Sequence, residues 1–118
     1  MTEEKSKDKK IKTELSKLRK VFKNLPEKQR KTVEKLLESA AFSAVSMEEL
    51  QEIINVEGYE TEYQNGEHQR GTKQSVALTS YLSLQKNYTK IIDTLLKYVP
   101  PEEKKNDKLQ EFMNAFKG

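Results

Sequence analysis

Several residue types that support chemistry are scarce in this sequence of 118 residues. It contains no cysteine, no tryptophan and one histidine. The absence of cysteine excludes disulfide bonds, thiolate chemistry and cysteine-based zinc sites. With His68 as the only imidazole, a histidine-based metal site or acid-base centre is not expected, and we interpret His68 as a surface turn residue.

Long apolar runs and phosphate-binding glycine patterns are also missing. No run approaches the ~18 apolar residues of a membrane-spanning helix, and the start MTEEKSKDKKIK lacks the apolar segment of a signal peptide. The four glycines form no nucleotide-binding motif, and no hydrolase, metalloprotease or EF-hand motif occurs. We therefore expect a soluble intracellular protein that is not an enzyme and that holds no cofactor or metal.

One group of carboxylates leaves a catalytic alternative open. A small metal-dependent hydrolase or nuclease would have to use them, but they are spread over predicted helix and loop at spacings that do not converge on one ion. This hypothesis is the least favoured. The carboxylates are Glu48, Glu49, Glu52, Glu57, Glu60, Glu62 and Glu67.

Charge is abundant and unevenly distributed. Residues 1–35 hold 13 Lys and Arg against 6 Asp and Glu, a balance of +7, whereas residues 36–67 hold 8 Glu and no Lys or Arg. Residues 68–118 return to a balance of +4, and the whole chain carries +3. This asymmetry predicts either a polyanionic partner for the basic region or attraction between the basic region of one copy and the acidic middle of another.

The longest amphipathic pattern extends from Ser75 to Val99 and contains no glycine or proline. Its apolar and aromatic residues form two adjoining rows, which predict one helix of roughly 37 Å ended by Pro100 and Pro101. A chain with 34% hydrophobic residues is not expected to cover both rows by itself. We therefore expect copies of the chain to associate through Leu78, Tyr81, Leu84, Tyr88, Ile91, Ile92 and Leu95.

Three shorter helices are predicted before the long one. The first begins at Lys9 after a disordered charged arm, residues 1–8, and ends near Asn24. The second begins at Pro26 and ends near Ser43. The third begins with a capping box at Ser46 and ends at Gly58.

Cations collect on the outer side of the first helix and at the start of the second. A solvated helix face and a phosphate-contacting ridge explain the first set equally well. The second set lies where the helix dipole disfavours positive charge, which hints at an anionic ligand. The candidate DNA-binding residues are Lys9, Lys12, Lys17, Lys20, Lys23, Lys28, Arg30 and Lys31.

The segment from Tyr59 to Lys73 is the one stretch without a helical pattern. Polar and aromatic residues alternate there, and Asn65-Gly66 favours a two-residue hairpin turn that would pair Tyr63 with His68. We expect a short exposed hairpin or an extended loop.

After the long helix, residues 101–118 read as a linker followed by a short amphipathic helix. Its apolar face is expected either to fold back on the chain, the favoured outcome, or to bind another protein. The face consists of Leu109, Phe112, Met113 and Phe116. The predicted fold is therefore all-α, with residues 9–100 as a helical assembly domain.

Two stretches resemble the small terminase subunit of tailed bacteriophages. They are AAFSAVSMEELQEIINVEG and YQNGEHQRGTKQSVALTSYLSLQKNYTKIIDTLLKYVPPE, and together they cover residues 40–102. One branch of that family is similar in having a short helix closed by glycine, a loop with turn residues, and a long helix that runs into proline. The corresponding positions here are Glu57-Gly58, Asn65-Gly66, Gly71 to Ser75 and Tyr98 to Pro100.

The resemblance implies a ring-forming, non-catalytic subunit in the cytoplasm of the infected bacterial host. Such a subunit binds double-stranded viral DNA and recruits the large terminase subunit for genome packaging. Relatives often carry an arginine soon after the proline that ends the long helix, whereas this chain has Glu102 and Glu103 there. The third predicted helix is acidic and unsuited to the major groove, so DNA contact is expected from the first two helices, mainly through phosphates.

A helical protein-interaction adaptor without nucleic-acid binding is the competing hypothesis. In that case the lysines only solubilise the first helix, and the terminal amphipathic helix docks on a partner. The oligomeric state and the salt dependence of DNA binding separate the two hypotheses.

Overall fold

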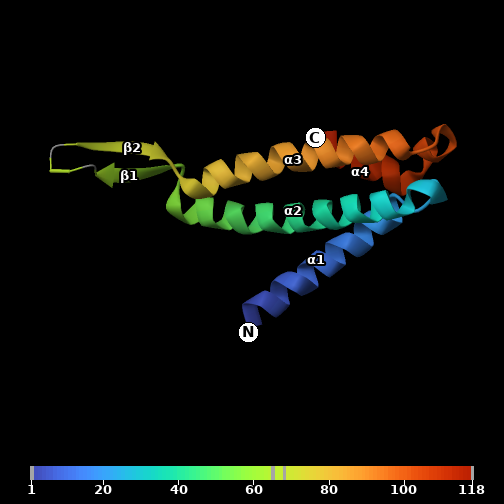
Figure 1. Ribbon diagram of the computed structural model, residues 1–118, viewed down its shortest axis with the longest axis horizontal. Coiled ribbons are helices and arrows are strands. Elements are labelled where there is room, and N and C mark those ends of the chain that lie inside the picture. The colour runs from blue at the N-terminus through green and yellow to red at the C-terminus, as the bar shows by residue number, and fades with distance from the viewer. Residues whose placement is uncertain (1, 65, 68, 118) are drawn as a thin grey trace.

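A computed structural model describes residues 2–64, 66, 67 and 69–117 of the chain (Figure 1). The molecule is elongated, with extents of 63 × 32 × 24 Å. It is mainly helical with one small antiparallel hairpin, which confirms the predicted helical character. The elements are α1 (Thr2–Val21), η1 (Glu27–Gln29), α2 (Arg30–Glu57), β1 (Glu60–Gln64), β2 (Arg70–Gln74), α3 (Val76–Tyr98), η2 (Pro101–Lys105) and α4 (Asp107–Lys117), where η denotes a short 3₁₀ helix.

The two longest helices, α2 and α3, lie side by side in opposite directions (Figure 1). The hairpin of β1 and β2 connects them at one end and projects beyond the helices, and we call this the hairpin end. At the opposite end, α1 joins α2 and α3 runs into η2 and α4, and we call this the loop end. At the loop end α1 packs against α2, and α4 turns back along the chain to contact α1.

The hydrophobic core occupies the loop end. It combines the second half of α1, the first half of α2, the second half of α3 and the start of α4. Ala40 and Ala41 have no exposed surface, because small side chains let a neighbouring helix approach closely. The buried cluster consists of Leu18, Phe22, Val33, Leu37, Ala40, Ala41, Ile92, Leu95, Val99 and Leu109.

The predicted break at Ser43 to Ser46 is wrong, because α2 runs unbroken through these residues. No glycine or proline interrupts the backbone there, and Ser43, Val45 and Ser46 are all buried, so packing keeps the segment helical. The Ser46 hydroxyl caps no helix, and it finds no hydrogen-bond partner among the described residues. Two helices therefore stand where three were predicted.

The first helix also differs from its predicted limits. It begins at Thr2, so most of the segment 1–8 that was expected to be disordered is helical, and it ends at Val21 rather than near Asn24. Lys7 anchors this first part, since its ammonium group lies 2.8 Å from the Glu49 carboxylate and 4.9 Å from the centre of the Phe42 ring. Contacts across the chain thus order a segment that has no apolar anchor of its own.

The hairpin forms with a longer connection than predicted. The register pairs Gln64 with Arg70 and Tyr63 with Gly71, so Asn65-Gly66 is not a two-residue turn. The expected partner of Tyr63, His68, lies outside the described residues. The Tyr63 ring covers Gly71, where an added Cβ would come within 3.0 Å of the Tyr63 hydroxyl. The absent side chain of Gly71 therefore favours the observed register.

The long helix agrees with the prediction to within one residue at each end. Ser75 caps α3, because its hydroxyl accepts a hydrogen bond of 3.0 Å from the Leu78 amide. The helix ends at Tyr98, two residues before Pro100.

Candidate interaction surfaces

The charge blocks of the sequence become two differently charged ends. The acidic middle of the chain forms the second part of α2 and strand β1, so Glu52, Glu57, Glu60 and Glu62 are exposed toward the hairpin end. The opposite end carries exposed cations from the end of α1, from η1, from the start of α2 and from η2. They are Lys20, Lys23, Lys28, Arg30, Lys31, Lys104 and Lys105.

All of the predicted DNA-binding residues are exposed. Five lie along α1 or just after it, and three lie on η1 and the first turn of α2, a turn that itself contains no acidic residue and has no capping side chain. The carboxylate of Glu27 lies 4.0 Å from the Arg30 guanidinium, the outer limit of an ion pair. These residues, Lys9, Lys12, Lys17, Lys20, Lys23, Lys28, Arg30 and Lys31, are therefore accessible to a polyanion.

One cation of α1 has a structural partner that the sequence did not reveal. Arg19 donates hydrogen bonds to the Glu34 carboxylate on α2, with its Nε 3.0 Å from the carboxylate oxygen. This contact raises the pKa of Arg19 above its usual value. It ties α1 to α2 across 15 positions of sequence, a separation too large for the spacing of residues within one helix to predict the contact.

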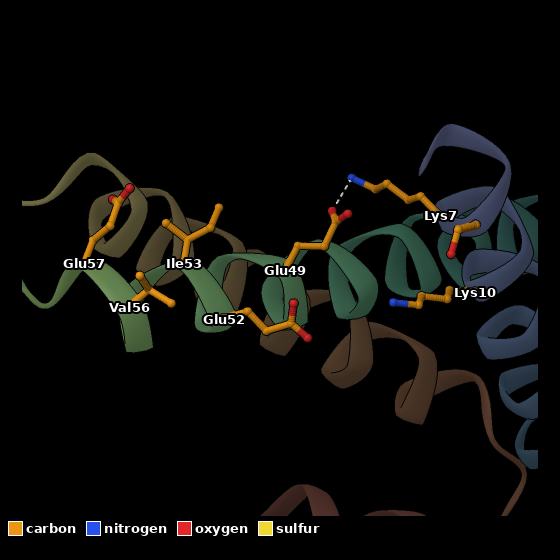
Figure 2. A pocket seen from close by; sticks show the side chains of 8 residues that line it. Lys7, Lys10, Glu49, Glu52, Ile53, Val56 and Glu57 are labelled. Atoms are coloured by element: carbon orange, nitrogen blue, oxygen red, sulfur yellow. Dashed lines mark ion pairs between the residues drawn. The ribbon is translucent and has the colours of Figure 1, made fainter. Parts of the chain in front are cut away.

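A groove separates the first turns of α1 from the second half of α2 (Figure 2). Lys7 and Lys10 reach from α1 toward Glu49 and Glu52 on α2, and the apolar side chain of Ile53 lies beside them. The attraction that the charge blocks predicted between copies is thus partly made within one chain, through the pair Lys7 and Glu49.

The seven residues predicted to mediate assembly do not share one surface. Ile92 and Leu95 have no exposed surface and belong to the core of the chain itself, so their assignment to an assembly interface is corrected. Tyr81 and Tyr88 line a groove shared with α4. The remaining three are half-buried: Leu78, Leu84 and Ile91.

Leu84 and Ile91 line an open groove between α2 and α3, and we call it the α2–α3 groove. Phe42 also lines this groove and is 49% exposed, although the helical pattern had not marked it as an assembly residue. Large apolar side chains are more exposed toward the hairpin end, where Val76 is 71% and Val56 is 86% exposed.

The terminal helix α4 is folded back, the outcome favoured for its apolar face. Leu109 is buried, and the Phe112 and Phe22 rings form a T-shaped pair with a centroid distance of 5.8 Å. Phe116 stacks on Phe112 and contacts Tyr88, and Met113 packs against the same core. Leu109 is accessible to a partner only if α4 detaches, whereas Phe112, Met113 and Phe116 are half-buried, and Phe112 and Phe116 line the groove shared with Tyr81 and Tyr88.

The aromatic contact at α4 affects the ionisation of one residue. Burial raises the pKa of Tyr88 to about 12, and the negative charge of Glu14 on α1 adds to this effect. Its ring joins α3 to α4 through the contact with Phe116.

Within the described part of the chain, no three residues of the types His, Cys, Asp or Glu are grouped so that they could hold a metal ion. No helix in these residues is both long enough and apolar enough to cross a membrane.

Comparisons with family models, with curated proteins and with solved structures found no match to this chain. The surfaces described above are therefore the basis for assigning a function.

Proposed function

We propose that this protein is a non-catalytic small terminase subunit that self-associates, binds double-stranded DNA and recruits the large terminase subunit. The observation that carries the proposal is the incomplete covering of α3. Ile92 and Leu95 in its second half lie in the core of the chain, whereas Leu84 and Ile91, nearer its middle, line an open groove. The resemblance of residues 40–102 to phage small terminase subunits suggests the role that such self-association would serve.

Self-association is supported by the α2–α3 groove. Phe42, Leu84 and Ile91 give it an apolar lining, and the flanking Glu38 and Lys90 supply charges of both signs at its rim. An apolar centre with a polar rim is typical of protein interfaces. Aromatic anchors such as Phe42 contribute most of the binding free energy in such interfaces.

DNA binding is supported by the exposed lysines of α1. From Lys9 to Lys20 they extend over about 16 Å of helix, and Lys23 follows just after its end, a length that spans several phosphates of B-form DNA. Lysines at this spacing contact the DNA backbone rather than base edges, so we expect weak sequence preference and a strong dependence on salt.

The adaptor hypothesis assigned partner binding to the apolar face of the terminal helix. That face has partners within its own chain, since Phe112 contacts Phe22 and Phe116 contacts Tyr88. Only the half-buried part of this face is left for a partner, and we do not propose the adaptor as a second function.

Assembly is tested by measuring mass with light scattering after size exclusion, at tens of micromolar protein. We expect a species much heavier than the 13.7 kDa of one chain. Phe42→Asp should reduce the mass, because a carboxylate in the apolar groove remains desolvated in the interface. Exposed Ser39, at the rim of the same groove, supplies the control Ser39→Asp, which should change the mass less. A strictly monomeric wild-type protein would reject the assembly proposal.

DNA binding is tested by reversing Lys20, Lys23, Arg30 and Lys31 to glutamate. The slope of log affinity against log salt should flatten by about 0.9 for each phosphate contact that is lost. The control reverses four other exposed lysines, Lys86, Lys97, Lys104 and Lys108, which changes the net charge equally and leaves α1 and α2 intact. Equal losses in both variants would reject the placement of the DNA surface on α1 and α2.

A further inference from the structure

The hairpin of β1 and β2 has features that neither the helical core nor DNA binding explains. It projects past the ends of α2 and α3 (Figure 1), and every residue of β1 is exposed. Among the residues that the structure describes, its two strands pair only with each other in a two-stranded sheet, so each keeps one edge with free backbone donors and acceptors. A two-stranded hairpin is marginally stable by itself, and further strands stabilise it.

The two strands carry opposite charges. Strand β1 contains Glu60 and Glu62 and no cation, whereas β2 contains Arg70 and Lys73 and no carboxylate. Directly opposed residues share a face of the sheet, so Arg70 lies on the same face as both glutamates, and Lys73 lies on the other. All four side chains are exposed.

Charged residues often protect strand edges from pairing with other strands. That protection requires charges that repel when two edges approach, such as lysines on both strands. Here the two free edges attract each other, because one is acidic and the other is basic. Pairing of β1 with β1 of another copy, or β2 with β2, brings like charges together.

We propose that hairpins of neighbouring copies pair edge to edge, with β1 of one copy against β2 of the next. This inference rests on the proposed self-association and adds a second contact to the α2–α3 groove. Antiparallel pairing in the register of the hairpin places Glu62 opposite Thr72 of the next copy and diagonal to its Arg70. Each added hairpin points in the same direction as the last. The contact is heterologous, so it suits a ring when the rotation between copies closes.

Charge exchange tests this pairing. The variant Glu60→Lys with Glu62→Lys has two basic edges, and the variant Arg70→Glu with Lys73→Glu has two acidic edges. Each variant alone should associate about tenfold more weakly than the wild type, because like charges now face each other. An equimolar mixture of the two should regain the wild-type association. In the mixture, the two strands within each variant hairpin still carry like charges. Regained association would therefore report pairing between copies rather than a more stable hairpin within each copy.

Cross-linking provides a second measurement, because the natural chain has no cysteine. Glu62→Cys mixed with Thr72→Cys should form a disulfide-linked dimer, since directly paired residues satisfy disulfide geometry. Glu62→Cys alone should form little. Thr61→Cys with Thr72→Cys is the control, because these positions lie on opposite faces of the sheet.

The outcomes separate this inference from the proposed function. If the wild-type chain associates while both charge variants keep its mass and concentration dependence, hairpin pairing is rejected and assembly through the groove stands. If Glu62→Cys alone forms the main dimer, the strands pair β1 with β1 and the head-to-tail arrangement is wrong. If the wild-type chain does not associate, both proposals fail.

Discussion

The two ends of this molecule are built from the same two helices and differ in how fully other elements cover them. At the loop end, α1 and α4 close over α2 and α3, and Ile92 and Leu95 have no exposed surface. At the hairpin end α2 and α3 are flanked by little else, and Val56, Val76 and Leu82 remain exposed. A helical sequence pattern therefore defines an apolar face, whereas the elements that pack on this face decide whether it becomes core or stays exposed.

The largest expected difference between the ends is in the cost of removing a leucine. Leu95→Ala should lower the free energy of unfolding by about 2 to 5 kcal/mol, because it leaves a cavity in a closed core. Leu82→Ala should cost less than about 1 kcal/mol in the isolated chain, since Leu82 is 47% exposed. Urea denaturation at low protein concentration measures both. Equal costs would remove the distinction between the two ends.

The covering of the loop end by α4 is tested with Phe112→Ala. This change removes the edge contact with Phe22 and the stacking on Phe116, and it should cost about 3 kcal/mol. Exposed Asn114 in the same helix supplies the control Asn114→Ala, which should be nearly neutral. Denaturant unfolding checks stability, and limited proteolysis checks whether α4 detaches. A neutral Phe112→Ala would show that α4 does not contribute to the core in solution.

The pKa of Tyr88 gives another test of how well α4 covers α3, through the pH dependence of the free energy of unfolding. The folded state holds the phenol proton up to about pH 12, whereas the unfolded chain loses it near pH 10.0. Stability from this group is therefore complete below pH 10.0 and is lost as the pH rises toward 12. Because solvent screens a partly exposed phenol, the wild type should lose only about 1 to 2 kcal/mol relative to Tyr88→Phe over this range. Parallel pH profiles would place Tyr88 in solvent instead.

The smallest expected effects come from two serines, and they differ in sign. Ser75→Ala should destabilise the chain by about 1 kcal/mol, because it removes the cap of α3 at the hairpin end. Ser46→Ala should stabilise it by about 1 kcal/mol, since it removes a buried hydroxyl without a partner from the middle of α2. Thermal unfolding of both variants distinguishes the cases. Destabilisation by Ser46→Ala would show that the Ser46 hydroxyl makes a stabilising hydrogen bond, as the predicted capping box requires.

The candidate surfaces were only partly predictable from sequence. The exposed cations of α1 follow from helical spacing, because residues away from the apolar stripe face solvent. The role of Phe42 in the α2–α3 groove and the partnership of Arg19 with Glu34 depend on which helices become neighbours. Local periodicity carries no information about that choice. The division of the α3 seam between core, α4 groove and open groove has the same origin.

Local residue patterns were enough to predict the long helix from Ser75 to its proline end, the hairpin segment, the separation of charge along the chain and the apolar face of α4. Each depends on residues close together in the chain, where spacing, caps and prolines act directly. Only the tertiary structure decided that α2 continues through Ser46, that residues 2–8 extend α1, and that Ile92 and Leu95 are core. These outcomes depend on burial against distant segments, whose free energy exceeds the small local preferences that favoured a break or a disordered arm.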